Sequence, residues 1–235
     1  MNQNGGGFLD RIPVVTKNLI IINLLFWVAS LSLPKAGIDL ISLLGLHFPG
    51  ATDFYPFQLI SYMFMHDTHS FAHVFFNMFA VYMFGRVLEN VWGLIFYMVT
   101  GIGAGLVQEL TWYFDLRDVI NAPQELVNIG GGQILDKADF YNLFVTVGAS
   151  GAVFGILLAF GMLFPNNRLF IFPLPFPIKA KFFVIGYAAI ELWAGLANSA
   201  GDNVAHFAHL GGMLFGLILI LYWRKKSNNN GTYYS

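Results

Sequence analysis

The sequence predicts an all-α membrane protein, a bundle of six transmembrane helices with both ends of the chain on the inner side of the membrane. Of the 235 residues, 57% are hydrophobic and only 11% are charged, whereas about 25% of the residues in a typical soluble domain are charged. Apolar runs long enough to cross a bilayer recur along the chain. The basic residues between these runs gather on alternate sides, and this pattern predicts the orientation.

Six apolar segments are expected to cross the membrane: residues 18–33, 71–88, 91–114, 140–164, 180–196 and 204–223. The first and fifth are close to the lower limit of about 17 residues for a spanning helix. Residues 18–223 then form one six-span domain, between a cytoplasmic segment of residues 1–17 and a disordered cytoplasmic tail of residues 224–235. Within the domain, residues 115–139 form an outer loop insertion whose three consecutive glycines are typical of a mobile loop.

The orientation follows from the basic residues that flank the six segments. With the N-terminus inside, the inner flanks hold nine of them: Arg11, Lys17, Arg86, Arg168, Lys179, Lys181, Arg224, Lys225 and Lys226. The outer flanks hold three, Lys35, Arg117 and Lys137. The N-terminus lacks the basic stretch and the immediate apolar core of a signal peptide, so the first apolar segment is expected to remain as a helix.

Composition also excludes several classes of function. The formal net charge is −1, which argues against a nucleic-acid partner. The chain has no cysteine, so it has no disulfide, no thiolate metal site and no cysteine nucleophile.

Polar side chains within the apolar segments are costly in lipid, and each therefore requires a partner or a role. The deep ones are His73, Asn77, Gln108, Ser150, Glu191, His206 and His209. With the N-terminus inside, the second, fourth and sixth segments all run from outside to inside. Counting a helical rise of 1.5 Å per residue from the outer acidic residues places His73, Ser150 and His209 at a similar depth, roughly 9–17 Å below the outer boundary.

Ser150 lies in the sequence GASG, between Gly148 and Gly151. Two flanking glycines allow neighbouring backbone to approach closely and leave the serine hydroxyl accessible. A serine hydroxyl is a weak nucleophile unless an adjacent base takes its proton. The pattern therefore makes Ser150 a candidate nucleophile that needs a base from another helix.

His209 is the candidate base. It precedes Gly212 and Gly216, whose spacing of four permits close helix contact. Such a contact between the fourth and sixth segments would bring His209 to Ser150. No acidic residue lies beside His209 in the sequence, which favours a Ser-His dyad over a triad.

His73 and Asn77 are four residues apart and therefore share one helix face. Acyl transfer needs hydrogen-bond donors for the developing oxyanion. Both side chains can donate, as can the backbone N–H of Ser150. The three groups are the candidate oxyanion hole.

Three motifs together resemble those of the rhomboid intramembrane serine proteases. They are HVFFN (His73 to Asn77), GASG (Gly148 to Gly151) and AHLGGMLFG (Ala208 to Gly216), and they follow the family's order. The resemblance covers nearly the whole chain and implies a bacterial-type six-helix core. It implies that Ser150 is the nucleophile, His209 the general base, and His73, Asn77 and the Ser150 amide the oxyanion hole.

The same resemblance implies an endopeptidase that cleaves transmembrane protein substrates near the outer membrane face and needs no cofactor. The partners would be these substrates and the lipid bilayer, in a multi-pass protein of the bacterial inner membrane. Gly148, Gly151, Gly212 and Gly216 would support the site. Phe154 occupies a position where some members have an aromatic ring that packs on the catalytic histidine, although core packing alone also explains it.

Two other functions remain open. The histidine pairs His69/His73 and His206/His209 have spacings that suit zinc or copper ligation, which would make the chain a metal-binding membrane protein or transporter. A non-catalytic rhomboid-like binder of transmembrane segments is the second alternative, although such relatives typically lack the serine or the histidine. Glu191 fits either a structural hydrogen bond or a proton path.

Overall fold

The computed structural model describes residues 11–91, 93–171, 175–197 and 205–229, together with Gly7. Within this part of the chain the six predicted apolar helices are all present. They are α1 (Val14–Ser32), α4 (Phe71–Ala80) with its continuation, α6 (Gly93–Asp115), α9 (Ser150–Leu163), α10 (Ala180–Ala197) and α11 (His206–Asn229). A π-helical turn (Val81–Gly85) and α5 (Arg86–Leu88) extend α4, so that the second span runs from Phe71 to Leu88 as predicted.

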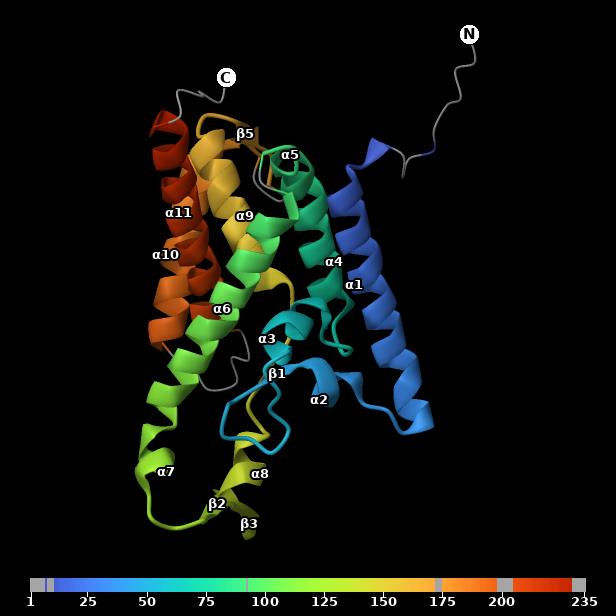
Figure 1. Cartoon of the computed structure of the whole chain (residues 1–235), viewed down its shortest axis with the longest axis vertical. Coiled ribbons are helices and arrows are strands. Elements are labelled where there is room, and N and C mark those ends of the chain that lie inside the picture. The colour runs from blue at the N-terminus through green and yellow to red at the C-terminus, as the bar shows by residue number, and fades with distance from the viewer. Residues whose placement is uncertain (1–6, 8–10, 92, 172–174, 198–204, 230–235) are drawn as a thin grey trace.

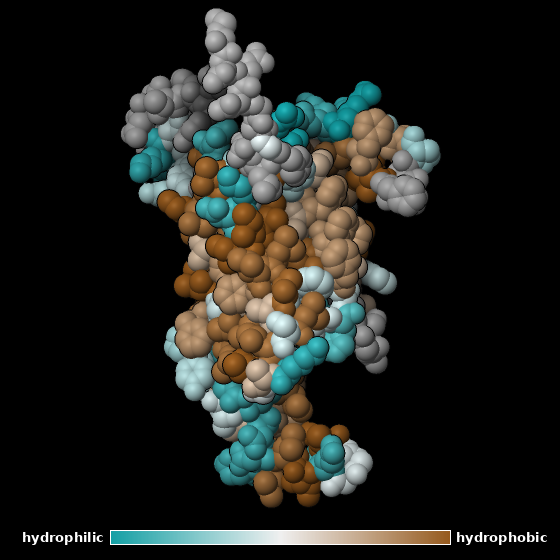
Figure 2. All heavy atoms as spheres, turned by 90° about the vertical axis from the view of Figure 1, so that its right-hand side faces the viewer, coloured by the Kyte–Doolittle hydropathy of each residue, from teal (hydrophilic) through white to brown (hydrophobic). Residues whose placement is uncertain are grey.

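Five of these stretches are long and apolar enough to cross a membrane, and α9 is a shorter apolar helix. Their outward side chains are apolar: Leu25 and Ile95 are each 64% exposed, and Trp193 is 72% exposed. Figure 2 shows such side chains as a band around the middle of the face that carries α1, with hydrophilic residues toward both ends. The prediction of a helical membrane bundle is confirmed.

The shorter elements lie at the two ends of the bundle. α1 begins and α11 ends at one end, as an even number of crossings requires, and the β5–β6 hairpin is at that end too (Figure 1). The opposite end carries α2 (Leu40–Leu44), β1 (Leu46–His47), α3 (Gln58–Ser61), α7 (Arg117–Asn121), β2 (Leu126–Gly130), β3 (Gln133–Asp136), α8 (Lys137–Tyr141) and β4 (Val145–Thr146). Strands β5 and β6 comprise Arg168–Leu169 and Ile178–Lys179, and 3₁₀ turns cover Leu33–Ala36 and Tyr62–Phe64. Which side of the membrane each end faces stays a prediction from the charge distribution.

The predicted start of the fourth helix near Phe140 is wrong. Residues 145–146 form strand β4, which pairs antiparallel with β1, and the helix begins only at Ser150. The Gly148 N–H donates to the carbonyl oxygen of Tyr62 at 2.9 Å, which fixes the extended chain to a buried loop. The apolar residues Val145 and Val147 are therefore half-buried in extended backbone, and α9 starts partway along the bundle (Figure 1).

The depth predicted for Ser150 assumed a continuous helix from Asp139, so that argument fails, although Ser150 still reaches the base. Other boundaries moved less. Helix α1 begins at Val14, inside the predicted N-terminal segment. Helix α11 continues through Asn229, so the prediction of disorder is wrong for residues 224–229; residues 230–235 lie outside the described chain.

Candidate active site

Ser150 and His209 meet where α9 and α11 pack together. The Ser150 hydroxyl lies 2.7 Å from Nε2 of His209, a hydrogen-bond distance across 59 residues of sequence. His209 is buried, with 8% of its surface exposed. The predicted contact between Ser150 and His209 is present in the structure, and Nε2 is the ring atom that faces the hydroxyl.

Glycines allow α9 and α11 to approach this closely. A Cβ atom on Gly212 would collide with the carbonyl oxygen of Gly151, and one on Gly216 would lie 3.4 Å from Gly155. On the other side of α9, a Cβ atom on Gly151 would overlap the side chain of Ala104 in α6. The predicted small-residue contact is therefore the interface that sets the distance between Ser150 and His209.

The ring of Phe154 lies flat on the ring of His209. Their centroids are 4.3 Å apart and their planes differ by 8°. Phe154 stands one turn after Ser150 on the same helix. Of the two interpretations of Phe154, the structure shows the stacking one, and the contact restricts rotation of the imidazole.

Glu191 of α10 corrects the expectation that His209 has no acidic partner. Its Oε2 atom lies 2.9 Å from Nδ1 of His209. The same oxygen lies 2.7 Å from Nδ1 of His206, one turn earlier on α11. The Glu191 residue is 7% exposed. Sequence reasoning missed this contact because the sequence does not show which faces of α10 and α11 pack together. The available signal was one acidic residue in an apolar span and a pair of histidines in the next span.

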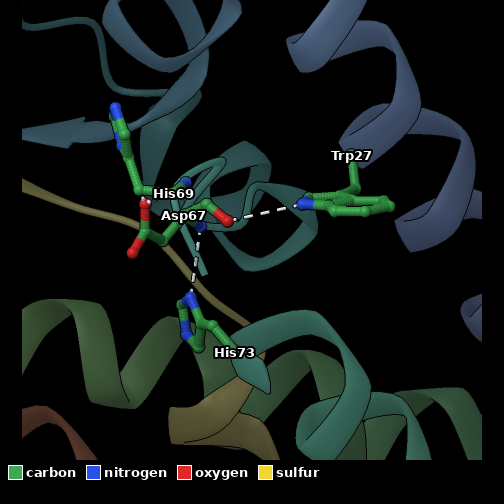
Figure 3. A network of polar contacts seen from close by, with 4 residues as sticks. All are labelled: Trp27, Asp67, His69 and His73. Carbon is green, nitrogen blue, oxygen red and sulfur yellow. Dashed lines mark hydrogen bonds and ion pairs between the residues drawn. The ribbon is translucent and has the colours of Figure 1, made fainter. Parts of the chain in front are cut away.

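His73 is held by a backbone donor from the loop that precedes α4. The N–H of Asp67 donates to Nδ1 of His73 at 3.1 Å, as Figure 3 shows. A neutral imidazole that accepts at Nδ1 carries its proton on Nε2. The Asp67 carbonyl in turn accepts from Nε1 of Trp27 in α1 at 3.3 Å, so that the loop supporting His73 is attached to a second helix.

Nε2 of His73 faces the space in front of Gly148. A Cβ atom at this glycine would lie 2.9 Å from Nε2 and 3.6 Å from the Ser150 hydroxyl oxygen. Gly148 has a φ of +131°, which L side chains rarely adopt. A side chain here would be strained and would fill the gap between donor and nucleophile, so both space and conformation require glycine.

The other two predicted oxyanion donors are the side chain of Asn77 and the backbone N–H of Ser150. Asn77 is buried, and its Nδ2 donates to the carbonyl oxygen of His73 at 2.8 Å, which leaves one amide hydrogen for another acceptor. The backbone N–H of Ser150 is the first of α9, and the earliest bond of that helix runs from Val153 to Ala149. The Ser150 amide thus has no acceptor within the helix, because the helix begins there.

A cavity of about 490 Å³ lies beside the site, on the predicted outer side. Its walls include Gln108 and Trp112 of α6, the segment Leu143–Thr146, and His206. His206, which bonds Glu191, is the residue of this cluster that lines the cavity.

The Glu191, His206 and His209 side chains could also be considered as metal ligands, since their ligating atoms lie within 4.8 Å of one another. The Oε2 to Nδ1 distances are 2.7 and 2.9 Å. Ligand atoms of a tetrahedral zinc site lie about 3.3 Å apart, given bonds of about 2.0–2.1 Å. The observed spacing is that of hydrogen bonds. The other predicted pair is His69 and His73. The His69 side chain is exposed and bonds Asp67, so it is not directed at a site shared with His73.

A model of the Rhomboid domain matches residues 53–226 of the chain. This chain belongs to the rhomboid family. It is also similar to the protein named Rhomboid protein 1, mitochondrial, of Saccharomyces cerevisiae, with 30% identity over 167 residues. That match covers 68% of this chain and 40% of the yeast protein, so the chain spans less than half the length of this relative.

Proposed function

We propose that this rhomboid is an active serine endopeptidase that hydrolyses peptide bonds of transmembrane substrates near the outer membrane face. The observation that carries the proposal is the 2.7 Å contact between the Ser150 hydroxyl and Nε2 of His209. In this mechanism His209 removes the proton as Ser150 attacks the substrate carbonyl. The resulting imidazolium then protonates the leaving amine, and water admitted from the outer cavity hydrolyses the acyl-enzyme.

Three donors support the developing oxyanion in this proposal. The Nε2–H of His73 and the second amide hydrogen of Asn77 lie on α4, and the free N–H of Ser150 stands at the start of α9. The positive end of the α9 dipole adds a favourable field at the same point. A site of this kind stabilises charge that appears only in the transition state, and the chemistry uses side chains and water without a cofactor.

The family supports a membrane location with transmembrane substrates, and we place the protein in the bacterial inner membrane on its resemblance to bacterial-type members. The yeast relative is named as mitochondrial. Fractionation of tagged chain expressed in its native cells tests the location. Recovery of the tagged chain outside the inner-membrane fraction would overturn it.

Labelling with a fluorophosphonate probe tests the nucleophile. Wild type should be labelled and should cleave a transmembrane reporter, whereas Ser150→Ala should do neither, because the attacking oxygen is removed. Ser32→Ala is the matched control, since Ser32 is exposed and bonds only within its own helix at Val28 and Ala29; it should behave as wild type. Equal labelling of wild type and Ser150→Ala would defeat the proposal.

A chelator tests the metal-binding alternative in the same assay. Reporter cleavage should be unchanged after treatment with EDTA, because the proposed mechanism has no metal step. Loss of cleavage on chelation, together with retained cleavage by Ser150→Ala, would favour a metal-dependent function. Binding of the reporter by wild type without any cleavage would favour the non-catalytic alternative.

A further inference from the structure

Glu191 is placed unlike any other side chain near it on α10. Its neighbours Ile190 and Trp193 are 59% and 72% exposed and face outward, while Glu191 is 7% exposed and faces α11. No other acidic residue occurs in Ala180–Ala197. A carboxyl group at this depth is costly unless it has partners. Its partners are the two histidines of α11.

We infer that Glu191 is a positioning residue that holds His209 in the orientation and tautomer needed for catalysis. This inference rests on the proposed function. A carboxylate only accepts hydrogen bonds, so the 2.9 Å contact places a proton on Nδ1 of His209. The neutral ring then has its lone pair on Nε2, the atom that faces the Ser150 hydroxyl. The arrangement extends the predicted dyad to a Ser-His-Glu triad.

The charge of Glu191 acts at the next step. When Nε2 takes the proton from Ser150, His209 becomes an imidazolium in a site with little water. An isolated cation is strongly disfavoured there, and a carboxylate against Nδ1 offsets that cost. Glu191 keeps its negative charge throughout, and the proton passes from Ser150 to His209 and then to the leaving amine.

His206 holds the carboxylate from the outer side. Its Nδ1 contacts the same Oε2 atom at 2.7 Å, and its ring forms part of the cavity wall. The shared oxygen of Glu191 is thereby fixed between two imidazoles, and Phe154 restricts the rotation of the His209 ring. His206 also covers Glu191 on the side of the cavity, which limits hydration of the carboxylate.

Glu191→Gln removes the charge and leaves the size of the side chain nearly unchanged. We expect kcat to fall by about 10²–10⁴-fold with little change in KM, as when the acid of a serine-protease triad becomes an amide. The acid limb of the pH profile of kcat/KM should move to lower pH, because the imidazolium of His209 loses its counter-charge. His73, which faces the site from α4, is unchanged in the variant. The measurement is reporter cleavage in detergent or liposomes across pH.

Three further variants sharpen the test. Glu191→Asp keeps the charge with a shorter reach and should recover part of the lost kcat, while His206→Gln should lower kcat by a few fold. Glu109→Gln is the matched control, because Glu109 is another acid of a membrane helix, on α6. Its carboxylate oxygens are buried and have no hydrogen-bond partner among the residues that the structure describes. This variant should leave kcat and the pH profile as in wild type.

The outcomes separate this inference from the proposed function. If labelling depends on Ser150 but Glu191→Gln keeps the wild-type kcat and pH profile, Glu191 has no positioning role and the nucleophile stands. If Glu191→Gln and Glu109→Gln lose activity equally with unshifted profiles, the effect is structural and the inference is wrong. Labelling that is independent of Ser150 would instead refute the proposed function itself.

Discussion

Two histidines lie near Ser150, and their hydrogen-bond partners favour opposite tautomers. His209 contacts a carboxylate at Nδ1, which leaves Nε2 to accept from the serine. His73 accepts a backbone N–H at Nδ1, which leaves its proton on Nε2. The same residue type is thus suited to act as a base on one side and as a donor on the other, according to which group bonds its far nitrogen.

The two sides also differ in how they are built. The His209 side joins three helices, α9, α10 and α11, through their side chains. The His73 side depends on a nearby loop, since Asp67 lies only six residues away in sequence. A base that gains charge needs a counter-charge, whereas a donor needs only a fixed orientation, and a neutral backbone group is sufficient for that.

His73→Ala gives the largest effect expected on the donor side. Removal of one oxyanion donor costs about 10²–10³ in kcat. The acid limb of the pH profile should stay in place, because Glu191 and His209 are untouched, and this contrasts with Glu191→Gln. Reporter kinetics across pH provide the measurement. A shifted limb in His73→Ala would show that the two histidines do not have separate roles.

Gly212→Ala tests the helix contact on the His209 side. The added methyl would collide with the Gly151 carbonyl, and overpacking of this kind costs about 3 kcal/mol of stability. Activity should fall as well, because α11 must move away from Ser150. The free energy of unfolding in detergent is the measurement. Gly186→Ala is the control, since nothing lies within 4 Å of its added Cβ; an equal loss there would rule out the contact as the cause.

The pH dependence of stability tests the surroundings of His73. Its expected effect is the smallest of these predictions. His66 packs edge-on against the His73 ring at 5.1 Å and bonds Asn23 of α1. Burial lowers the pKa of His66 to about 3, below its usual value of about 6.5. The unfolded chain therefore takes up this proton first. The contribution of neutral His66 to the free energy of unfolding is therefore fully present above pH 6.5 and is lost as the pH falls toward 3. At pH 5 the free energy of unfolding should be lower by about 2 kcal/mol.

His66→Gln should remove most of that dependence, whereas His69→Gln should keep it, because His69 is exposed. Unfolding free energies at pH 7 and pH 5 in detergent provide the comparison. An identical drop in wild type and His66→Gln would mean that another group titrates.

The membrane bundle and the contact between Ser150 and His209 could be predicted because their signals are local. Apolar length gave the helices, and the motifs around Ser150 and His209 gave residues whose contact the structure then showed. The start of α9 could not be placed by apolarity, because the half-buried extended segment before it is as apolar as a helix. The β-branched residues Val145, Thr146 and Val147 before Gly148 were the available hint.

The sequence by itself determined which groups could react and which helices carry them. Only the tertiary structure decided the protonation geometry. Glu191 reaches His209 across a helix pair, the Asp67 amide reaches His73 through a loop, and the Ser150 amide is free because β4 pairs with β1 ahead of α9. A tautomer depends on the partner of the second ring nitrogen, and that partner lies on another segment whose distance is set by packing.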